Sequence, residues 1–398
     1  MSRLREDAAK RLLATVGLAT PRGAVAASPA EAAAAAAALG GPVAVKALVP
    51  VGRKGLAGAV RRAATPAAAA EAAAALLGRA VHHFPVERVL VEEWIAVERE
   101  LYAAVLLEDA AVALASTAGG VAVEAMARQP GALQRLPLDP WRGLAAYEAR
   151  GLWAALGLTG PALRAAGEAL YQLGLAFARY DATLIEVNPL ALTPDGRAVV
   201  VGALMAVDDD ALGRQPALAE LAEAGNERAW RPLTALEREA LAVDAAEPYR
   251  GTARYTEFEG GDIACLCGGG GASLLLMDAL RRAGGRPANY SEFGGNPSAE
   301  KVHGLARVAL SKPGVRGLFV CQNITSNTQV DLSAEGVLRA LAERGLAGSR
   351  FPVVLRLAGV GEERARALCA AAGVEYHADD LTLEQAAARM VEVMRATA

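Results

Sequence analysis

Three polar loops in the second half of the chain have residue types that suit the binding of an anion. Each follows a predicted strand and precedes a predicted helix. The loops are Gly268–Ser273 (GGGGAS), Phe293–Ser298 (FGGNPS) and Gln322–Thr328 (QNITSNT). Glycines let backbone N–H groups approach an anion, and a helix N-terminus adds partial positive charge. A tight turn explains one such loop equally well, but three together predict a binding site.

The candidate acid-binding residues lie in these loops and at the end of a fourth predicted strand, 352–357. This strand carries Arg356, whose guanidinium suits a carboxylate through two parallel hydrogen bonds. A surface arginine without a role is the alternative interpretation. The complete set of acid-binding candidates is Gly269, Gly270, Gly295, Asn296, Ser326, Asn327, Thr328 and Arg356.

The first half of the chain places a lysine and a basic glycine loop in succession. Lys46 lies in the apolar strand 42–48, and Gly52–Gly58 (GRKGLAG) follows it. A lysine with a buried stem beside a flexible basic loop suits nucleotide phosphates, although a solvated loop is the alternative. Glu92 and Glu93 end the next strand, where an adenine amino group or a ribose hydroxyl would be met.

The elements that position these residues differ between the two halves. In the first half, 100–107 and 110–116 read as neighbouring antiparallel strands. In the second half, strands at 262–267, 288–293, 317–322 and 352–357 alternate with helices, which predicts a doubly wound parallel sheet. Ligands bind beyond the carboxyl ends of such strands. The stretch 217–256 is helical and polar, and we interpret it as the connection.

The bulk composition excludes several classes of protein. The 398 residues allow two or three domains, and 53% hydrophobic but 5% aromatic residues predict a core of Ala, Val and Leu. The net charge of −3 comes from interspersed charges, which argues against nucleic acid as a partner. No apolar run is long enough for a membrane span. The four cysteines lack zinc spacing, and the chain reads as cytoplasmic.

Several longer blocks resemble one family in their order along the chain. LIEVNPLALTPDGRAVVV (184–201) resembles the ATP-grasp motif of succinyl-CoA synthetase β subunits, and the other blocks are ASTAGGVAVEAMA (115–127), LPLDPWRG (136–143) and DDDALGRQP (208–216). The chain is thus similar over its whole length to the family of succinyl-CoA synthetase β subunits and ATP-citrate lyase. The resemblance implies an α/β fold with an ATP-grasp domain of two subdomains, followed by a flavodoxin-like CoA-ligase domain.

The domain limits that follow are 1–235 for the ATP-grasp domain, with a lid-like subdomain at about 20–100, 236–256 for the connection and 257–398 for the CoA-ligase domain. In family terms, the nucleotide (ATP or ADP) would be bound by Lys46, Arg53, Lys54, Gly55, Glu92, Glu93 and Glu100, and Mg²⁺ by Asn188. A partner α subunit would bind CoA and carry the histidine that shuttles the phosphoryl group. None of His82, His83, His303 and His377 has the glycine-flanked setting of that histidine.

The second domain departs from the succinate-type pattern. GGGGAS and ANYSEFGGNPS (288–298) are more similar to ATP-citrate lyase and citryl-CoA synthetase. Thr325 and Ser326 stand where succinate enzymes have glycines, and they add hydrogen-bond donors for an acid with more oxygen atoms. We therefore expect a citrate-like hydroxy-polycarboxylate as the acid, with succinate next and malate or another acid as further alternatives.

A second departure lies in the predicted metal site. The family has a Mg²⁺-binding aspartate at the position of Gly202, and the usual Gly-Arg-Gly-Lys-Ala-Gly loop reads Arg53-Lys54-Gly55-Leu56-Ala57-Gly58 here. Loss of a carboxylate leaves Asn188 as a weak Mg²⁺ anchor. Glu186 and Asp208–Asp210 are candidate replacements. The alternative function is a non-catalytic or regulatory subunit with an impaired nucleotide site.

Overall fold

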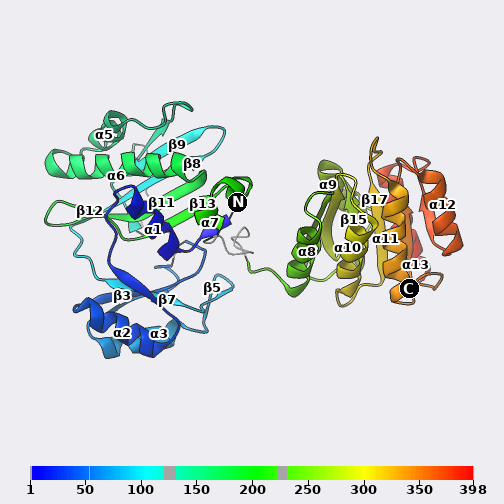
Figure 1. Ribbon diagram of the computed structural model, residues 1–398, viewed down its shortest axis with the longest axis horizontal. Coiled ribbons are helices and arrows are strands. Elements are labelled where there is room, and N and C mark those ends of the chain that lie inside the picture. Colours follow the sequence, from blue (N-terminus) through cyan, green and yellow to red (C-terminus); the bar gives the residue numbers. More distant parts are fainter. Residues whose placement is uncertain (1, 53, 121–130, 220, 222–230, 398) are drawn as a thin grey trace. The chain divides into compact units, whose positions relative to one another are not determined.

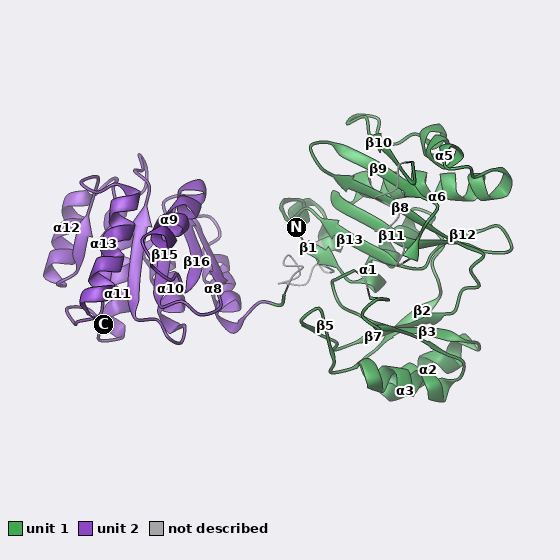
Figure 2. Cartoon of the chain, turned by 180° about the vertical axis from the view of Figure 1, so that it is seen from behind, with its two compact units in different colours: residues 1–232 green, residues 233–398 purple. Residues whose placement is uncertain are grey.

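A computed structural model of the chain describes residues 2–52, 54–120, 131–219, 221 and 231–397. The chain divides into two compact units, Met1–Pro232 and Leu233–Ala398 (Figure 2). Among the described helices, none combines the length and the apolar character needed to cross a membrane.

The larger sheet of the first unit is antiparallel and carries most of its core. Its strand order is β1 (Ser2–Leu4), β13 (Ala203–Val207), β11 (Ala182–Leu192), β8 (Arg99–Leu107), β9 (Ala111–Ser116) and β10 (Leu133–Pro137), and β12 (Ala198–Val200) pairs with β11. The predicted antiparallel pair 100–107 and 110–116 is confirmed as β8 and β9.

Helices α5 (Ala146–Ala155) and α6 (Gly160–Arg179) lie along one face of this sheet (Figure 1). Leu170 and Leu173 of α6 and Trp153 of α5 are fully buried against Ile185 of β11. The N-terminal helix α1 (Glu6–Thr15) adds Leu12 and Leu13 to the same core. The chain then leaves the sheet through the 3-10 helix η2 (Asp209–Arg214) and α7 (Pro216–Ala219).

A smaller sheet in the first unit has the order β2 (Gly23–Ala26), β7 (Val89–Glu93), β3 (Val43–Ala47) and β4 (Val60–Ala63). Helices α2 (Pro29–Leu39) and α3 (Pro66–Leu76) pack on it, and both begin at a hydroxyl cap, Ser28 and Thr65. The buried core here is mostly alanine and valine, as the composition predicts. A two-residue turn joins β5 (Ala80–Val81) to β6 (Phe84–Pro85).

The second unit is a mostly parallel sheet covered on both faces. The strand order is β14 (Thr252–Glu257), β16 (Asn289–Gly294), β15 (Ile263–Gly268), β17 (Gly317–Gln322), β18 (Val353–Arg356) and β19 (Glu375–His377). One apolar core joins α8 (Ala235–Ala246), α10 (Ala299–Ser311), α11 (Val330–Glu343) and α12 (Glu362–Ala371) to one face. A second core joins α9 (Gly270–Arg282) and α13 (Leu383–Ala396) to the other, and the doubly wound architecture is confirmed.

The predicted connection at 236–256 is wrong in its structural role. Residues 235–246 form α8 and residues 252–257 form β14, which pairs antiparallel with β16 at the edge of the second sheet. Ala253 and Tyr255 of β14 are buried while Arg254 is exposed, so the strand has the alternation of a half-buried edge. The break between the units falls at Pro232 and Leu233, before α8.

Candidate functional site: a lysine-lined cavity in the first unit

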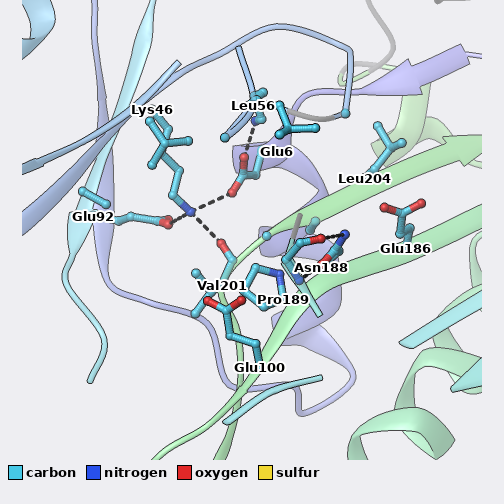
Figure 3. A pocket seen from close by; sticks show the side chains of 18 of the residues that line it. Glu6, Lys46, Leu56, Glu92, Glu100, Glu186, Asn188, Pro189, Val201 and Leu204 are labelled. Atoms are coloured by element: carbon cyan, nitrogen blue, oxygen red, sulfur yellow. Dashed lines mark hydrogen bonds and ion pairs between the residues drawn. The ribbon is translucent and has the colours of Figure 1, made fainter. Parts of the chain in front are cut away.

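A cavity of about 1030 Å³ in the first unit gathers the predicted nucleotide-binding residues (Figure 3). It is lined from the small sheet, from the large sheet and from the start of α1. The predicted residues that line it are Lys46, Lys54, Gly55, Glu92, Glu93, Glu100 and Asn188. Arg53 lies outside the described residues. Side chains from segments far apart in the chain therefore surround one space.

Lys46 is buried on β3 and its ammonium group points into a cluster of acceptors (Figure 3). Its Nζ donates to the backbone oxygen of Val201 at 2.6 Å and to Glu6 Oε1 at 3.1 Å, and it forms an ion pair with Glu92. Burial by itself lowers the pKa of Lys46, but the carboxylates of Glu6 and Glu92 outweigh it and raise that pKa above its ordinary value. Lys46 is therefore held as a cation.

Two further lysines complete this cluster. Lys10 of α1 contacts both carboxylate oxygens of Glu92 at 2.8 Å, Glu6 at 2.9 Å and the oxygen of Val201 at 2.6 Å. Lys54, from the basic loop, forms an ion pair with Glu6. Burial is the largest influence on Glu6, but the three lysines overcome it and hold its pKa well below the ordinary value. Glu6 is therefore held as a carboxylate, whereas burial lowers the pKa of Lys10.

The other predicted carboxylates have different surroundings. Glu93 accepts from the guanidinium of Arg22 at 3.0 Å and from its backbone N–H at 3.1 Å, so it is tied to the chain before β2. The backbone oxygen of Glu100 accepts from Gly119 at 3.1 Å. The carboxylate of Glu92 is engaged by Lys10 and Lys46, and a contact of these glutamates with a base or ribose stays a prediction.

The described residues do not fit a Mg²⁺ site at Asn188. Its Oδ1 accepts from the Gly120 N–H at 2.6 Å and its Nδ2 donates to the Gly120 oxygen at 3.2 Å, so the amide clamps a backbone segment. A Cβ on Gly202 would overlap the backbone oxygen of Asn188, which leaves no room for an aspartate there. Within the described part of the chain, no three His, Cys, Asp or Glu side chains group as metal ligands.

In the second unit, the predicted acid-binding loops meet at the carboxyl edge of the parallel sheet, because β16, β15, β17 and β18 are neighbours. The Asn323 N–H donates to Gly268 at 3.4 Å, which joins the first loop to the third. Asn296 Oδ1 accepts from the Gln329 N–H at 3.0 Å, which joins the second loop to the third. Asn296 itself has a φ of 56°, a left-handed conformation that asparagine tolerates.

The side chains at this edge differ in exposure. Ser326 and Asn327 are exposed, whereas Thr328 is buried. Gly269 and Gly270 lie at the start of α9, with Gly269 at a φ of 91°. Arg356 is buried, and it donates to the backbone oxygens of Gln322 at 2.6 Å and Leu381 at 3.0 Å. Two donors of its guanidinium are thus engaged, and its role as a carboxylate ligand stays a prediction.

Sequence reasoning missed several residues of both sites. Glu6 and Lys10 were not among the predicted site residues, although a Glu and a Lys one helical turn apart are a detectable signal. His82 and His83 line the cavity from the turn between β5 and β6, with φ values of 47° and 71°. At the acid edge, Arg250 donates to the Asn296 oxygen at 3.1 Å and to Gln329 at 3.2 Å, within the stretch interpreted as a connection.

Each of the two units matches a known protein family. Residues 3–192 match the ATP-grasp domain family, and residues 233–375 match the family described as ATP citrate lyase citrate-binding. The β subunit of ADP-forming succinate–CoA ligase from Rubrobacter xylanophilus is 37% identical over 403 residues, covering 98% of each chain. A probable malate–CoA ligase β subunit from Mesorhizobium japonicum is 33% identical, covering 99% of this chain and 98% of its own.

A solved structure shares the fold over the same length. The ATP citrate lyase of Methanothrix soehngenii superimposes with a TM-score of 0.80 at 20% identity, covering 98% of this chain and 99% of that one. An ATP-grasp unit with a lysine-lined cavity, followed by a doubly wound unit, defines an ATP-grasp ligase. The chain belongs to the family of succinyl-CoA synthetase β subunits and ATP-citrate lyases, as a β subunit of the ADP- or GDP-forming acyl-CoA ligase type.

Proposed function

We propose that the cavity of the first unit binds the nucleotide of an acyl-CoA ligase reaction, with Lys46 and Lys54 directed at its phosphates. The observation that carries this proposal is that six predicted nucleotide-binding residues from distant segments, together with the predicted metal ligand Asn188, line one cavity of about 1030 Å³. This volume lies at the upper end of the range for ligand pockets, so a nucleotide fits. Ammonium groups are suited to phosphate oxygens as compact point charges.

The chain acts with an α-type partner that binds CoA and supplies the histidine for phosphoryl transfer. The terminal phosphoryl group passes from the nucleotide to that histidine and then to a carboxylate oxygen of the acid, which gives an acyl phosphate. The sulfur of CoA then displaces phosphate and forms the thioester. On this chain, Lys46 and Lys54 bind and orient the nucleotide, and the loops of the second unit bind the acid.

The acid is a hydroxy-polycarboxylate of the citrate type in this proposal, ahead of succinate and malate. The match of residues 233–375 to a citrate-binding family supports this preference. The exposed side chains of Ser326 and Asn327 offer polar groups at the edge where the glycine loops meet. Because relatives include a succinate–CoA ligase and a probable malate–CoA ligase, succinate and malate are tested as substrates beside citrate.

The test is turnover by the complete complex. The chain is co-purified with the α-type subunit of the same source, and thioester formation from CoA is followed with ATP and with GTP. Citrate, succinate and malate are supplied at equal concentrations. We expect the highest kcat/KM with citrate. A higher kcat/KM with succinate or malate rejects the acid assignment but leaves the nucleotide assignment standing.

The geometry at Gly202 favours a second candidate function. This position has no room for a carboxylate, and Asn188 clamps Gly120. In the second candidate function, the chain is a subunit that binds nucleotide and acid without supporting phosphoryl transfer. Nucleotide binding by the purified chain, combined with no thioester formation by the complex with any of the three acids, would establish this regulatory role.

A further inference from the structure

Every N–H of the Lys46 ammonium already has an acceptor within the chain. An ammonium group has three donors. They meet the oxygen of Val201 at 2.6 Å, Glu6 at 3.1 Å and the carboxylate of Glu92 (Figure 3). A phosphate oxygen can therefore bind Lys46 only by replacing one of these acceptors.

Glu6 is the acceptor that is replaced most readily. Its oxygen is the most distant of the three from Lys46 Nζ, at 3.1 Å. Glu92 lies on β7, which pairs with the strand of Lys46 inside the small sheet, and the Val201 acceptor is a backbone atom. Glu6 lies in the first turn of α1 and reaches the lysines through a flexible side chain. It also lines the cavity.

Lys10 is a partner that Glu6 keeps when it leaves Lys46. It lies one turn further along α1, and its Nζ is 2.9 Å from Glu6 Oε1. A buried carboxylate that loses its cationic partners raises the free energy of the folded chain. Because Lys10 remains as a partner, Glu6 can release Lys46 and Lys54 without being left buried and unpaired.

We propose that Glu6 is an internal competitor of the nucleotide phosphates, and that Lys10 retains its carboxylate when nucleotide binds. This inference rests on the proposed nucleotide site and describes its regulation. The cluster of Lys10, Lys46, Lys54, Glu6 and Glu92 has three ammonium groups and two carboxylates, so it carries one net positive charge. The exchange replaces one anion on Lys46 and Lys54 by another.

Two neighbouring residues on one helix therefore have opposite effects on nucleotide affinity. Glu6→Gln removes the competing charge, and we expect ADP to bind about fivefold or more tightly, because the energy needed to release the lysines falls. Lys10→Met removes the partner that retains Glu6, and we expect ADP to bind about fivefold or more weakly. A general distortion of α1 would weaken binding in both variants.

The experiment is calorimetric titration of ADP, with EDTA present, into the full-length chain and its variants. Glu71→Gln removes an exposed carboxylate on α3 and serves as the control, with affinity unchanged. If Lys10→Met does not fold, Glu6→Gln and the double variant Glu6→Gln/Lys10→Met decide, because the double variant is expected to bind at least as tightly as the wild type.

The outcomes separate this inference from the proposed function. Tighter binding by Glu6→Gln and weaker binding by Lys10→Met support it. Equal or weaker binding by Glu6→Gln, with ADP bound by the wild type, overturns the inference alone. No ADP binding by the wild type or by any variant overturns the nucleotide site and the inference with it.

Discussion

Gly202 and Asn188 lie in neighbouring backbone segments of the large sheet that contact each other closely. The Asn188 N–H donates to the Gly202 oxygen at 3.0 Å, and the Gly202 N–H donates to the Pro189 oxygen at 3.3 Å. A side chain at Gly202 would overlap the Asn188 oxygen. The glycine is therefore required by close backbone packing, and a family aspartate at this position needs a different local backbone.

Gly202→Ala is expected to lower the free energy of unfolding by about 2 kcal/mol, because the added methyl group forces the backbone of Asn188 to shift. Gly213→Ala is the matched control, since an added Cβ there meets nothing within 4 Å. Urea unfolding of both variants measures the difference. Equal stability of the two would contradict the close packing of Gly202.

Glu6 should make the stability of the chain sensitive to acid. Its pKa in the folded chain lies well below 4.5, because the lysines outweigh the effect of burial. A carboxyl with a lowered folded pKa contributes stability above its unfolded pKa, and this contribution is lost as the pH falls through the folded value. The free energy of unfolding should therefore fall below pH 4.5 more steeply in the wild type than in Glu6→Gln. Urea unfolding over a series of pH values measures both slopes, and parallel slopes would show that Glu6 contributes nothing.

At the scale of elements, local patterns predicted the second unit well. The predicted strand 317–322 has the same bounds as β17. The predicted strands 262–267, 288–293 and 352–357 differ from β15, β16 and β18 by one residue at each end. The strands 262–267, 317–322 and 352–357 are short, mostly apolar runs, whereas 288–293 mixes polar and aromatic residues. Polar or glycine residues and then a helix follow each strand, so periodicity and turn chemistry agree. Strand β14 was missed although its buried Ala253 and Tyr255 alternate with polar residues, which is a detectable strand signal.

Pairings between distant segments were beyond the sequence pattern. Lys46 and Glu92 were predicted near the nucleotide from their strand ends, but nothing local indicates that Lys10 meets Glu92, 82 residues away. An impaired metal site at Gly202 was predicted from the family pattern, and it stays a prediction. The close approach of the Asn188 carbonyl to Gly202 was not predictable, because it depends on the antiparallel pairing of β11 with β13.

The polar loop after β17 should discriminate between acids. Ser326→Ala and Asn327→Ala remove exposed polar side chains at the edge where the glycine loops meet. If each side chain donates one hydrogen bond to the acid, we expect citrate binding to weaken by about fivefold per substitution, with a smaller loss for succinate. Calorimetric titration of the two acids measures this, with Asp278→Asn, an exposed residue on α9, as the control. Equal losses for both acids would mean that this loop does not set the preference.

At the scale of the whole molecule, each unit gathers its own set of predicted ligand-binding residues. The first unit gathers the lysine-lined cavity, and the second brings three polar loops to one sheet edge. The order of the two units agrees with relatives that match over 98% of the chain. The two-unit architecture is therefore shared with these relatives along nearly the whole chain.

The most direct test of the nucleotide site is a calorimetric titration of ADP into the purified chain and into Lys46→Met, with and without Mg²⁺. We expect the wild type to bind ADP with a Kd in about the micromolar range and Lys46→Met to bind at least about tenfold more weakly. We also expect little strengthening by Mg²⁺, since the described residues at Asn188 and Gly202 do not fit a metal. No binding by the wild type, or equal binding by Lys46→Met, would contradict the central claim that this cavity binds the nucleotide through Lys46.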